Sequence, residues 1–167
     1  MAQQTISTGT SANDGTGDTL RSAGTKINQN FTEVYGLFPT RVSETVTTGT
    51  LADSADGNIS FSNLGRSFIL TSIKPNKAAY IRLYTDDSSR TADTSSGRGQ
   101  MFANEGAIGY QGIIWEGVTS ADSSIKVAPG LIGYIDSPGS TLPARIRNLS
   151  GGSTTVAVTI NSTKLES

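Results

Sequence analysis

The sequence predicts a mainly β protein in which an N-terminal arm and a single helix precede an antiparallel, jelly-roll-like β-sandwich. Three observations predict this class. Serine, threonine and glycine are abundant, with 22, 22 and 19 copies among 167 residues. Short runs of alternating apolar and polar residues follow one another from about residue 42, and turn residues separate these runs. Turn signals at intervals of roughly eight to twelve residues are typical of sandwiches and barrels.

The first element is an arm followed by a helix. Residues 1–17 are rich in Gln, Thr, Ser and Gly and predict an extended or disordered arm. The helix is expected from about Asp18, whose side chain can cap the first turn, to Gly36, and Pro39 then prevents continuation. The glycines of Gly15–Gly17 are expected to supply the positive φ of a tight turn, and not a phosphate cradle, because no strand precedes them.

The apolar side chains of this helix recur at heptad spacing and predict an interface with other polypeptide. The predicted anchoring residues are Leu20, Ile27, Phe31, Val34 and Tyr35. Two interpretations remain open: a coiled-coil seam, trimeric, in which Asn30 sets the register, or a helix that docks on a neighbouring subunit or on the chain's own sandwich. The stripe spans only about two and a half heptads, and Gly24 costs about 1 kcal/mol relative to alanine, which favours docking.

The remaining chain is expected to form strands without a helix. We expect three parts: the arm and anchoring helix at 1–40, a linker with one or two short strands at 41–65, and the β-sandwich at 66–167. Residues 42–48 alternate as a strand does, and residues 53–58 read as a turn-rich link. The strands expected in the sandwich are 67–73, 79–85, 110–118, 124–127, 131–135, 144–149 and 154–159.

Two aromatic features of the sandwich are candidates for contact with a partner or ligand. Tyr80, Arg82 and Tyr84 share one face of their strand, opposite Ile81. That face suits a sugar ring or a flat partner, but it is equally typical of a cross-strand ladder or a subunit contact. Trp115 lies in a strongly strand-forming run, where a tryptophan belongs to a core or an interface more often than to a glycan platform.

The composition excludes several kinds of chemistry. The chain has no cysteine and no histidine, which excludes disulfides, thiolate and imidazole zinc sites, and Ser-His-Asp or Cys-His nucleophiles. A glycoside hydrolase would need two carboxylates about 5–10 Å apart. The candidates are Asp86, Asp87, Asp93, Glu105, Glu116 and Asp122. No pair stands out, so we expect no enzyme, no cofactor and no metal, and a plain exposed loop at 86–99 in place of a calcium site.

Charge and hydropathy exclude two classes of partner. The net charge is −1, which gives no electrostatic reason to expect nucleic acid or an anionic membrane as a partner. No apolar run approaches the roughly 18 residues that a membrane span requires. The first four residues lack the basic start and apolar core of a signal peptide, so we expect synthesis in a cytoplasm.

The N-terminal sequence resembles a motif of tailed-bacteriophage virion proteins. Residues 13–21 read NDGTGDTLR and residues 26–35 read KINQNFTEVY. The motif has the general form NDGTGD-LR-A--KIN-NF-E-Y and occurs near the start of tail-fibre, baseplate and neck-type proteins of cyanophages and T4-like phages. It covers about 23 residues, and Gly24 stands where the motif carries a bulkier residue.

This resemblance implies a structural virion protein that is anchored by its N-terminal helix and projects its sandwich. The implied partners are other virion proteins of the tail or connector and further copies of the chain, a homotrimer being favoured. The implied location is the tail or connector region of the virion, with the host cytoplasm before assembly. The alternatives are a receptor- or glycan-binding module at a fibre tip, which binds a host surface glycan, and a capsid-bound decoration protein.

Overall fold

The structure forms two units. The computed structural model describes residues 3–11, 14–36, 38–93, 112–136, 139 and 141–165. Its contacts divide the chain between Phe38 and Pro39. The N-terminal unit contains the arm and helix α1, and the second unit contains the eight strands of the described residues and a short second helix.

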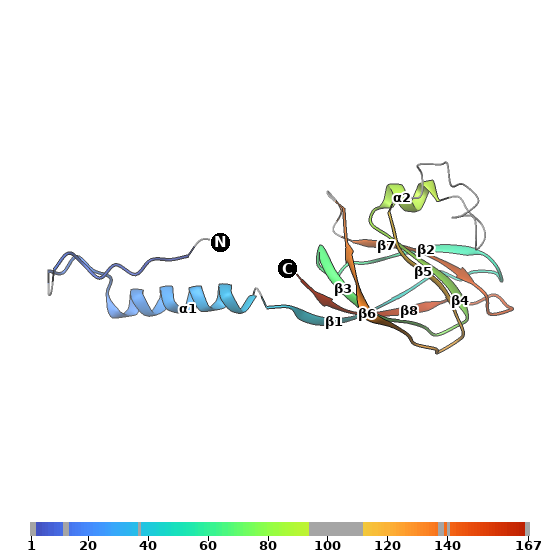
Figure 1. The fold of residues 1–167 in the computed structure, drawn as a ribbon, viewed down its shortest axis with the longest axis horizontal. Helices are drawn as coiled ribbons and strands as arrows, with labels where there is room; N and C mark the ends of the chain where they lie inside the picture. The colour runs from blue at the N-terminus through green and yellow to red at the C-terminus, as the bar shows by residue number, and fades with distance from the viewer. Residues whose placement is uncertain are drawn as a thin grey trace. The chain divides into compact units, whose positions relative to one another are not determined.

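Helix α1 (Leu20–Gly36) begins two residues later than the sequence predicts. Its cap is Thr19, whose Oγ1 accepts a hydrogen bond from the amide of Ser22 at 3.2 Å. The prediction that Asp18 caps the helix was wrong, because its carboxylate accepts instead from the amide of Ser7 in the arm, at 2.7 Å. The arm is extended, as one of the two expected alternatives, and it runs back alongside α1 (Figure 1).

The sandwich consists of two antiparallel four-stranded sheets (Figure 1). One sheet has the strand order β1-β8-β3-β6 and the other β2-β7-β4-β5. The strands are β1 Thr40–Thr47, β2 Asp56–Phe61, β3 Ser67–Pro75, β4 Ala79–Tyr84, β5 Ile113–Thr119, β6 Ile125–Tyr134, β7 Leu142–Asn148 and β8 Ala157–Lys164. Each sheet interleaves strands from the two ends of the domain, which is the order of a jelly roll. The predicted fold class is confirmed.

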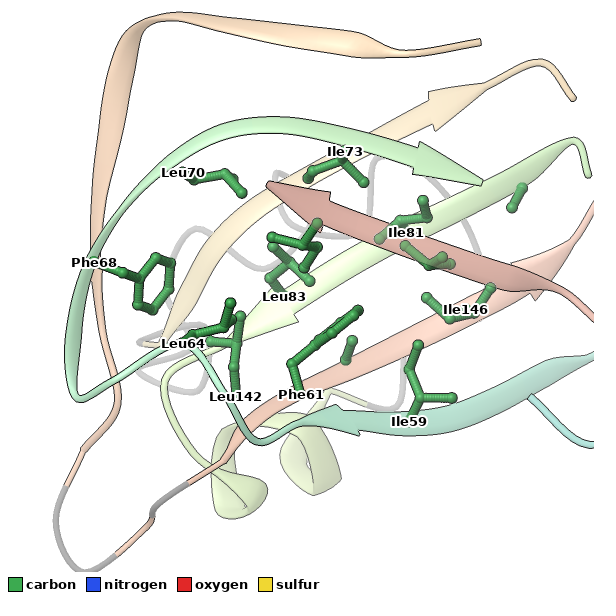
Figure 2. Close-up of a cluster of buried hydrophobic side chains, with 14 of the residues drawn as sticks. Ile59, Phe61, Leu64, Phe68, Leu70, Ile73, Ile81, Leu83, Leu142 and Ile146 are labelled. Carbon is green, nitrogen blue, oxygen red and sulfur yellow. The ribbon is translucent and has the colours of Figure 1, made fainter. Parts of the chain in front are cut away.

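The hydrophobic core lies between the inner faces of the two sheets. Figure 2 shows Phe61 of β2, Phe68 of β3, Leu83 of β4 and Ile146 of β7 in one cluster, and all four are fully buried. Burying a side chain of this size contributes about 1.5–3 kcal/mol. The sandwich therefore completes its own core from residues of this chain.

The segment expected to be a linker supplies one strand to each sheet. β1 pairs with β8, so that Val42 lies opposite Ser162, and β2 pairs with β7, so that Ile59 lies opposite Ala144. The sandwich therefore begins at Pro39 and not near residue 66. The local sequence of β2 reads as a turn because it is short and polar at its start, and only pairing with β7 makes it a strand.

Strand β6 is continuous where the sequence predicts two strands separated by Pro129-Gly130. The pairing of β6 with β3 is interrupted at this dipeptide: β6 advances five residues from Lys126 to Leu131 while β3 advances two, between Ser72 and Leu70, so residues 127–130 have no partner in the register with β3. An interruption of the ladder tolerates a proline, which has no amide hydrogen to donate.

The described part of the second half of the chain contains a short helix, contrary to the prediction. Helix α2 (Asp87–Ala92) is capped by Asp86, whose carboxylate accepts from the amide of Ser89 at 2.7 Å. The capping lowers the pKa of Asp86, since hydrogen bonds from the Ser89 amide favour the charged form. Residues 94–99 of the predicted exposed loop and the first residues of the predicted strand 110–118 lie outside the described residues.

Candidate assembly interface

The turn between arm and helix is organised by one carboxylate. Asp14 accepts hydrogen bonds from Thr10 Oγ1 and from the amides of Thr10, Ser11 and Thr16, at 2.7–2.9 Å. These hydrogen bonds favour the charged carboxylate and hold the pKa of Asp14 well below its usual range. The hydrogen bond from the Thr10 hydroxyl makes the largest contribution. Gly15 has the expected positive φ of 70°, which favours glycine.

Gly17 has a different role from the expected one. Its φ is not positive; a Cβ there would lie 3.0–3.1 Å from backbone atoms of Ser7, Thr8 and Gly9. Glycine at this position therefore permits the arm backbone to approach the turn, and the neighbouring Asp18 amide donates to the Ser7 carbonyl at 2.8 Å.

A second carboxylate clamps the arm to the helix. Asp18 Oδ2 accepts from the Ser7 amide and from Lys26 Nζ, each at 2.7 Å. Lys26 Nζ also donates to the carbonyl of Thr5 at 3.0 Å. The hydrogen bond and charge of Lys26 lower the pKa of Asp18. The arm is thus tied to the first two turns of α1.

Asn30 fastens the far end of the arm. Its Oδ1 accepts from the Gln4 amide and its Nδ2 donates to the Gln4 carbonyl, both at 2.9 Å. A side-chain amide that donates to and accepts from one residue's backbone imitates a strand partner. The expectation that Asn30 sets the register of a coiled coil was wrong, because its side-chain amide is bonded to the arm.

The arm covers one flank of α1 and leaves the apolar stripe exposed. Ser22, Lys26 and Asn30 are four residues apart, so they form one row along the helix, and each is half-buried. α1 has no buried residue. All five predicted anchoring residues are exposed, from 41% for Ile27 to 91% for Leu20.

The exposed stripe keeps the three-four spacing of a helical seam. Leu20, Ile27 and Val34 recur every seven residues, and Phe31 lies four residues after Ile27 and three before Val34. The rings of Phe31 and Tyr35 are stacked with centroids 6.2 Å apart. Large apolar side chains aligned on one face and open to solvent are typical of a surface that other polypeptide covers.

Tyr80, Arg82 and Tyr84 lie beneath the surface of the sandwich. Each is at most 4% exposed, on the outer side of β4, where α2 packs. Arg82 Nη1 and Tyr84 Oη both bond Asp93 Oδ2 at 2.5 Å, and Arg145 donates to the Asp93 carbonyl. The geometry therefore favours the cross-strand ladder, and these side chains are not accessible to a partner or ligand.

Two tyrosines of this ladder have raised pKa values. Burial raises the pKa of Tyr84, and its hydrogen bond to the Asp93 carboxylate adds to the shift. Burial also raises the pKa of Tyr80, which donates a hydrogen bond to Glu116. Arg82 lies 5.0 Å from the centroid of the Tyr80 ring, as a cation–π pair does. This network fastens the end of α2 to its sheet through Asp93, which follows the helix, and the sequence pattern did not predict the buried ion pair of Asp93 with Arg82.

Trp115 is half-buried and packs against the core. Its ring lies over Gly117, where a Cβ would come within 2.6 Å of the indole. The tryptophan therefore packs from β5 against the core, as the core interpretation expects.

The carboxylates considered for hydrolysis are held by other groups where the structure describes them. Asp86 caps α2, Asp87 pairs with Arg90, Asp93 with Arg82, Glu116 with Tyr80, and Asp122 with Lys74. Glu105 lies outside the described residues. Within the described ranges, no three acidic residues gather in a way that would hold a metal ion. Among those residues, too, no helix has the length and apolar content of a membrane span.

Comparison with known proteins identifies the family. A family model described as "Bacteriophage T4 gp9/10-like protein, N-terminal" matches residues 3–132, which is most of the chain. The chain belongs to the T4 gp9/10-like family. It is therefore a structural protein of a tailed-phage virion, of the tail or baseplate type, and the resemblance of residues 13–35 is confirmed. The match begins in the arm and ends within β6, so it spans both units.

Other comparisons add little to this assignment. No curated protein matches the chain. A de novo designed double-stranded β-helix solved by NMR is 14% identical, with a TM-score of 0.29, over 72% of this chain and 97% of that one. A protein of the disulfide-linked pili of Bacillus endospore appendages is 12% identical, with a TM-score of 0.36, over 79% and 94%. Neither likeness carries an argument at these scores.

Proposed function

We propose that this T4 gp9/10-like protein is a non-enzymatic assembly component that is anchored in the tail, connector or baseplate region by α1 and projects its sandwich. The observation that carries the proposal is the stripe of Leu20, Ile27, Phe31, Val34 and Tyr35, which is exposed although the arm is already bonded to the helix. The arm occupies the polar flank and does not cover the stripe, and we infer that another virion protein or another copy of the chain covers it.

A homotrimer is the assembly that we propose. The three-four spacing of Ile27, Phe31 and Val34 supports packing of identical helices. In this assembly the arms lie outside the seam, since Lys26 and Asn30 hold them on the flank. A sedimentation measurement on the full chain is expected to give three times the 17.4 kDa chain mass. A monomer would contradict self-association.

A matched pair of helix variants tests the anchoring role. The first replaces Ile27, Phe31 and Val34 with serine, and the control replaces the exposed polar residues Arg21, Gln29 and Thr32 with serine. Isoleucine, phenylalanine, valine and threonine have about the helix propensity of serine, whereas arginine and glutamine have a higher one, so the control weakens the helix at least as much as the stripe variant does. We expect the first variant to be absent from purified particles and the control to be present at the level of the unmodified protein.

Two outcomes would contradict the anchoring proposal. One is normal incorporation of the stripe variant. The other is equal loss of both variants, which would mean that helix stability and not the apolar stripe determines incorporation. The sandwich of each variant should unfold at the same temperature, because its core contains no residue of α1.

A further inference from the structure

The two sheets of the sandwich present different outer faces. On the β2-β7-β4-β5 sheet, α2 packs on β4 and β7, and the cations of the outer face meet carboxylates: Arg82 pairs with Asp93, and Arg147 with Asp56. On the β1-β8-β3-β6 sheet, the outward side chains are exposed or half-buried along β1 and β8. The second face is therefore the one open to a ligand.

A hollow of about 540 Å³ lies on this open face. Its walls are two rows of cross-strand partners, Arg41 with Thr163 and Ser43 with Asn161. Thr71, at the irregularity of β3, and Lys126 of β6 also line the hollow. We call these six side chains, Arg41, Ser43, Thr71, Lys126, Asn161 and Thr163, the basic hollow.

The basic hollow carries positive charge that the chain does not neutralise. Arg41 and Lys126 have no hydrogen-bond or ion-pair partner among the described residues, and the lining of the hollow includes no carboxylate. By contrast, Lys74 of the same sheet has an ion-pair partner, Asp122, at 3.6 Å. Two uncompensated cations beside one hollow favour an anionic ligand.

The neutral groups of the hollow suit a polyhydroxylated ligand. The hydroxyls of Ser43 and Thr163 make no hydrogen bond within the described part of the chain, so they are free to donate and accept. Asn161 donates to Ser72 Oγ at 2.9 Å through Nδ2, which leaves its Oδ1 to accept from a ligand. Saccharide hydroxyls both donate and accept, and they match such a set.

The neighbouring part of the same face offers apolar contact area. Ile132 lies opposite Ile69, in the row that Arg41 and Thr163 begin, and is 69% exposed. Tyr134, two residues further along β6, is 57% exposed. A tyrosine ring beside a polar hollow can lie against the apolar face of a pyranose while its hydroxyl meets water.

A protein partner fits this hollow less well. Protein interfaces depend on aromatic or aliphatic anchors that fill dry pockets, whereas the apolar side chain of Val42 in this lining packs towards the core. The charges and hydroxyls would remain wet under a protein surface. We propose that the basic hollow binds an acidic oligosaccharide, with one carboxylate at Arg41 of β1, another at Lys126 of β6 on the opposite edge of the sheet, and sugar hydroxyls on Ser43, Asn161 and Thr163.

Calorimetric titration of the full chain tests this site independently of particle assembly. The probe is trigalacturonic acid, with maltotriose as the neutral saccharide and hexaglutamate as the acidic peptide. We expect saturable binding of trigalacturonic acid and at least tenfold weaker binding of the other two. Arg41→Gln and Lys126→Gln should each raise the Kd about tenfold, which is the usual size of a lost charge-assisted hydrogen bond.

The control variant is Lys77→Gln, because Lys77 is an exposed cation outside the hollow. It should leave the Kd unchanged. The proposal is overturned if trigalacturonic acid shows no saturable binding up to about 10 mM, a concentration that would detect even millimolar affinity. It is also overturned if hexaglutamate binds equally well, or if Lys77→Gln weakens binding as much as Arg41→Gln, since either result would mean non-specific charge attraction.

Discussion

The two units of this chain differ in what they complete for themselves. The sandwich buries its large apolar side chains, such as Phe61 and Phe68, completely. The N-terminal unit satisfies its backbone polar groups instead, through Asp14, Asp18 and Asn30, and leaves Phe31 in solvent. A short unit can therefore meet its hydrogen-bonding needs alone and still leave its large apolar side chains exposed.

The largest expected effect is on the free energy of unfolding, when one phenylalanine in each unit is replaced by alanine. Phe61→Ala should lower the free energy of unfolding by about 3–5 kcal/mol, because it removes a fully buried ring from the core. Phe31→Ala, at a position 55% exposed, should change it by less than about 0.5 kcal/mol in the isolated chain. Urea unfolding followed by tryptophan fluorescence measures both. A large loss in Phe31→Ala would mean that α1 packs within the chain.

The next effect tests whether the covered face of the sandwich depends on its buried ion pair. Asp93→Asn should destabilise the sandwich by about 3 kcal/mol, because it removes the carboxylate bonded to the buried guanidinium of Arg82 and leaves only that of Asp56 at 3.9 Å. Asp122→Asn is the control, since its pair with Lys74 is exposed and worth less than about 1 kcal/mol. Thermal unfolding compares the two, and similar midpoints would refute the structural role of the network.

A smaller effect is expected at the arm. Asn30→Ala removes both hydrogen bonds to the Gln4 backbone, each worth about 1 kcal/mol. Amide exchange at Gln4 should then become as fast as in an unfolded peptide. Asn28→Ala should leave it protected, because the Asn28 side chain is exposed and has no partner among the described residues. Unchanged protection in Asn30→Ala would show that other groups hold the arm.

The smallest effect is a dependence of the arm on pH. The pKa values of Asp14 and Asp18 are lowered from 3.8 in the folded chain, so both carboxylates favour the folded arm fully above that pH. This contribution should begin to fall below pH 3.8 and disappear as the pH drops through the folded values. Amide chemical shifts of Ser7 and Thr16 report it, and a transition above pH 5 would contradict the assignment. In Asp14→Asn the Thr16 amide should not titrate.

Periodicity predicted the elements that are long or strongly alternating. The helix, β1 and most strands of the sandwich follow from spacing alone, because 3.6- and 2-residue periods reflect which side of an element faces apolar groups. Periodicity did not predict the short elements. β2 depends on pairing with β7, and α2 depends on the cap at Asp86, a signal that was present in the polar loop but not recognised.

The candidate functional residues likewise fall into a group that the sequence predicted and a group that it did not. The exposed stripe of α1 was readable, since heptad spacing is local. The burial of Tyr80, Arg82 and Tyr84 was not, because their partners are distant in sequence: Arg82 and Tyr84 bond Asp93, eleven and nine residues away, and Tyr80 bonds Glu116 of β5. The basic hollow joins four strands from Arg41 to Thr163, and no local pattern links those residues.

The amino-acid sequence by itself determined that this protein is a β-sandwich behind an amphipathic helix, and that its N-terminal motif is that of a phage virion protein. Only the tertiary structure decided which polar residues serve the chain itself: Asn30 holds the arm, and Asp93 neutralises Arg82. The physical reason is that apolar periodicity is written in neighbouring residues, whereas the partner of a hydrogen bond or a charge is set by which distant segments the fold brings together.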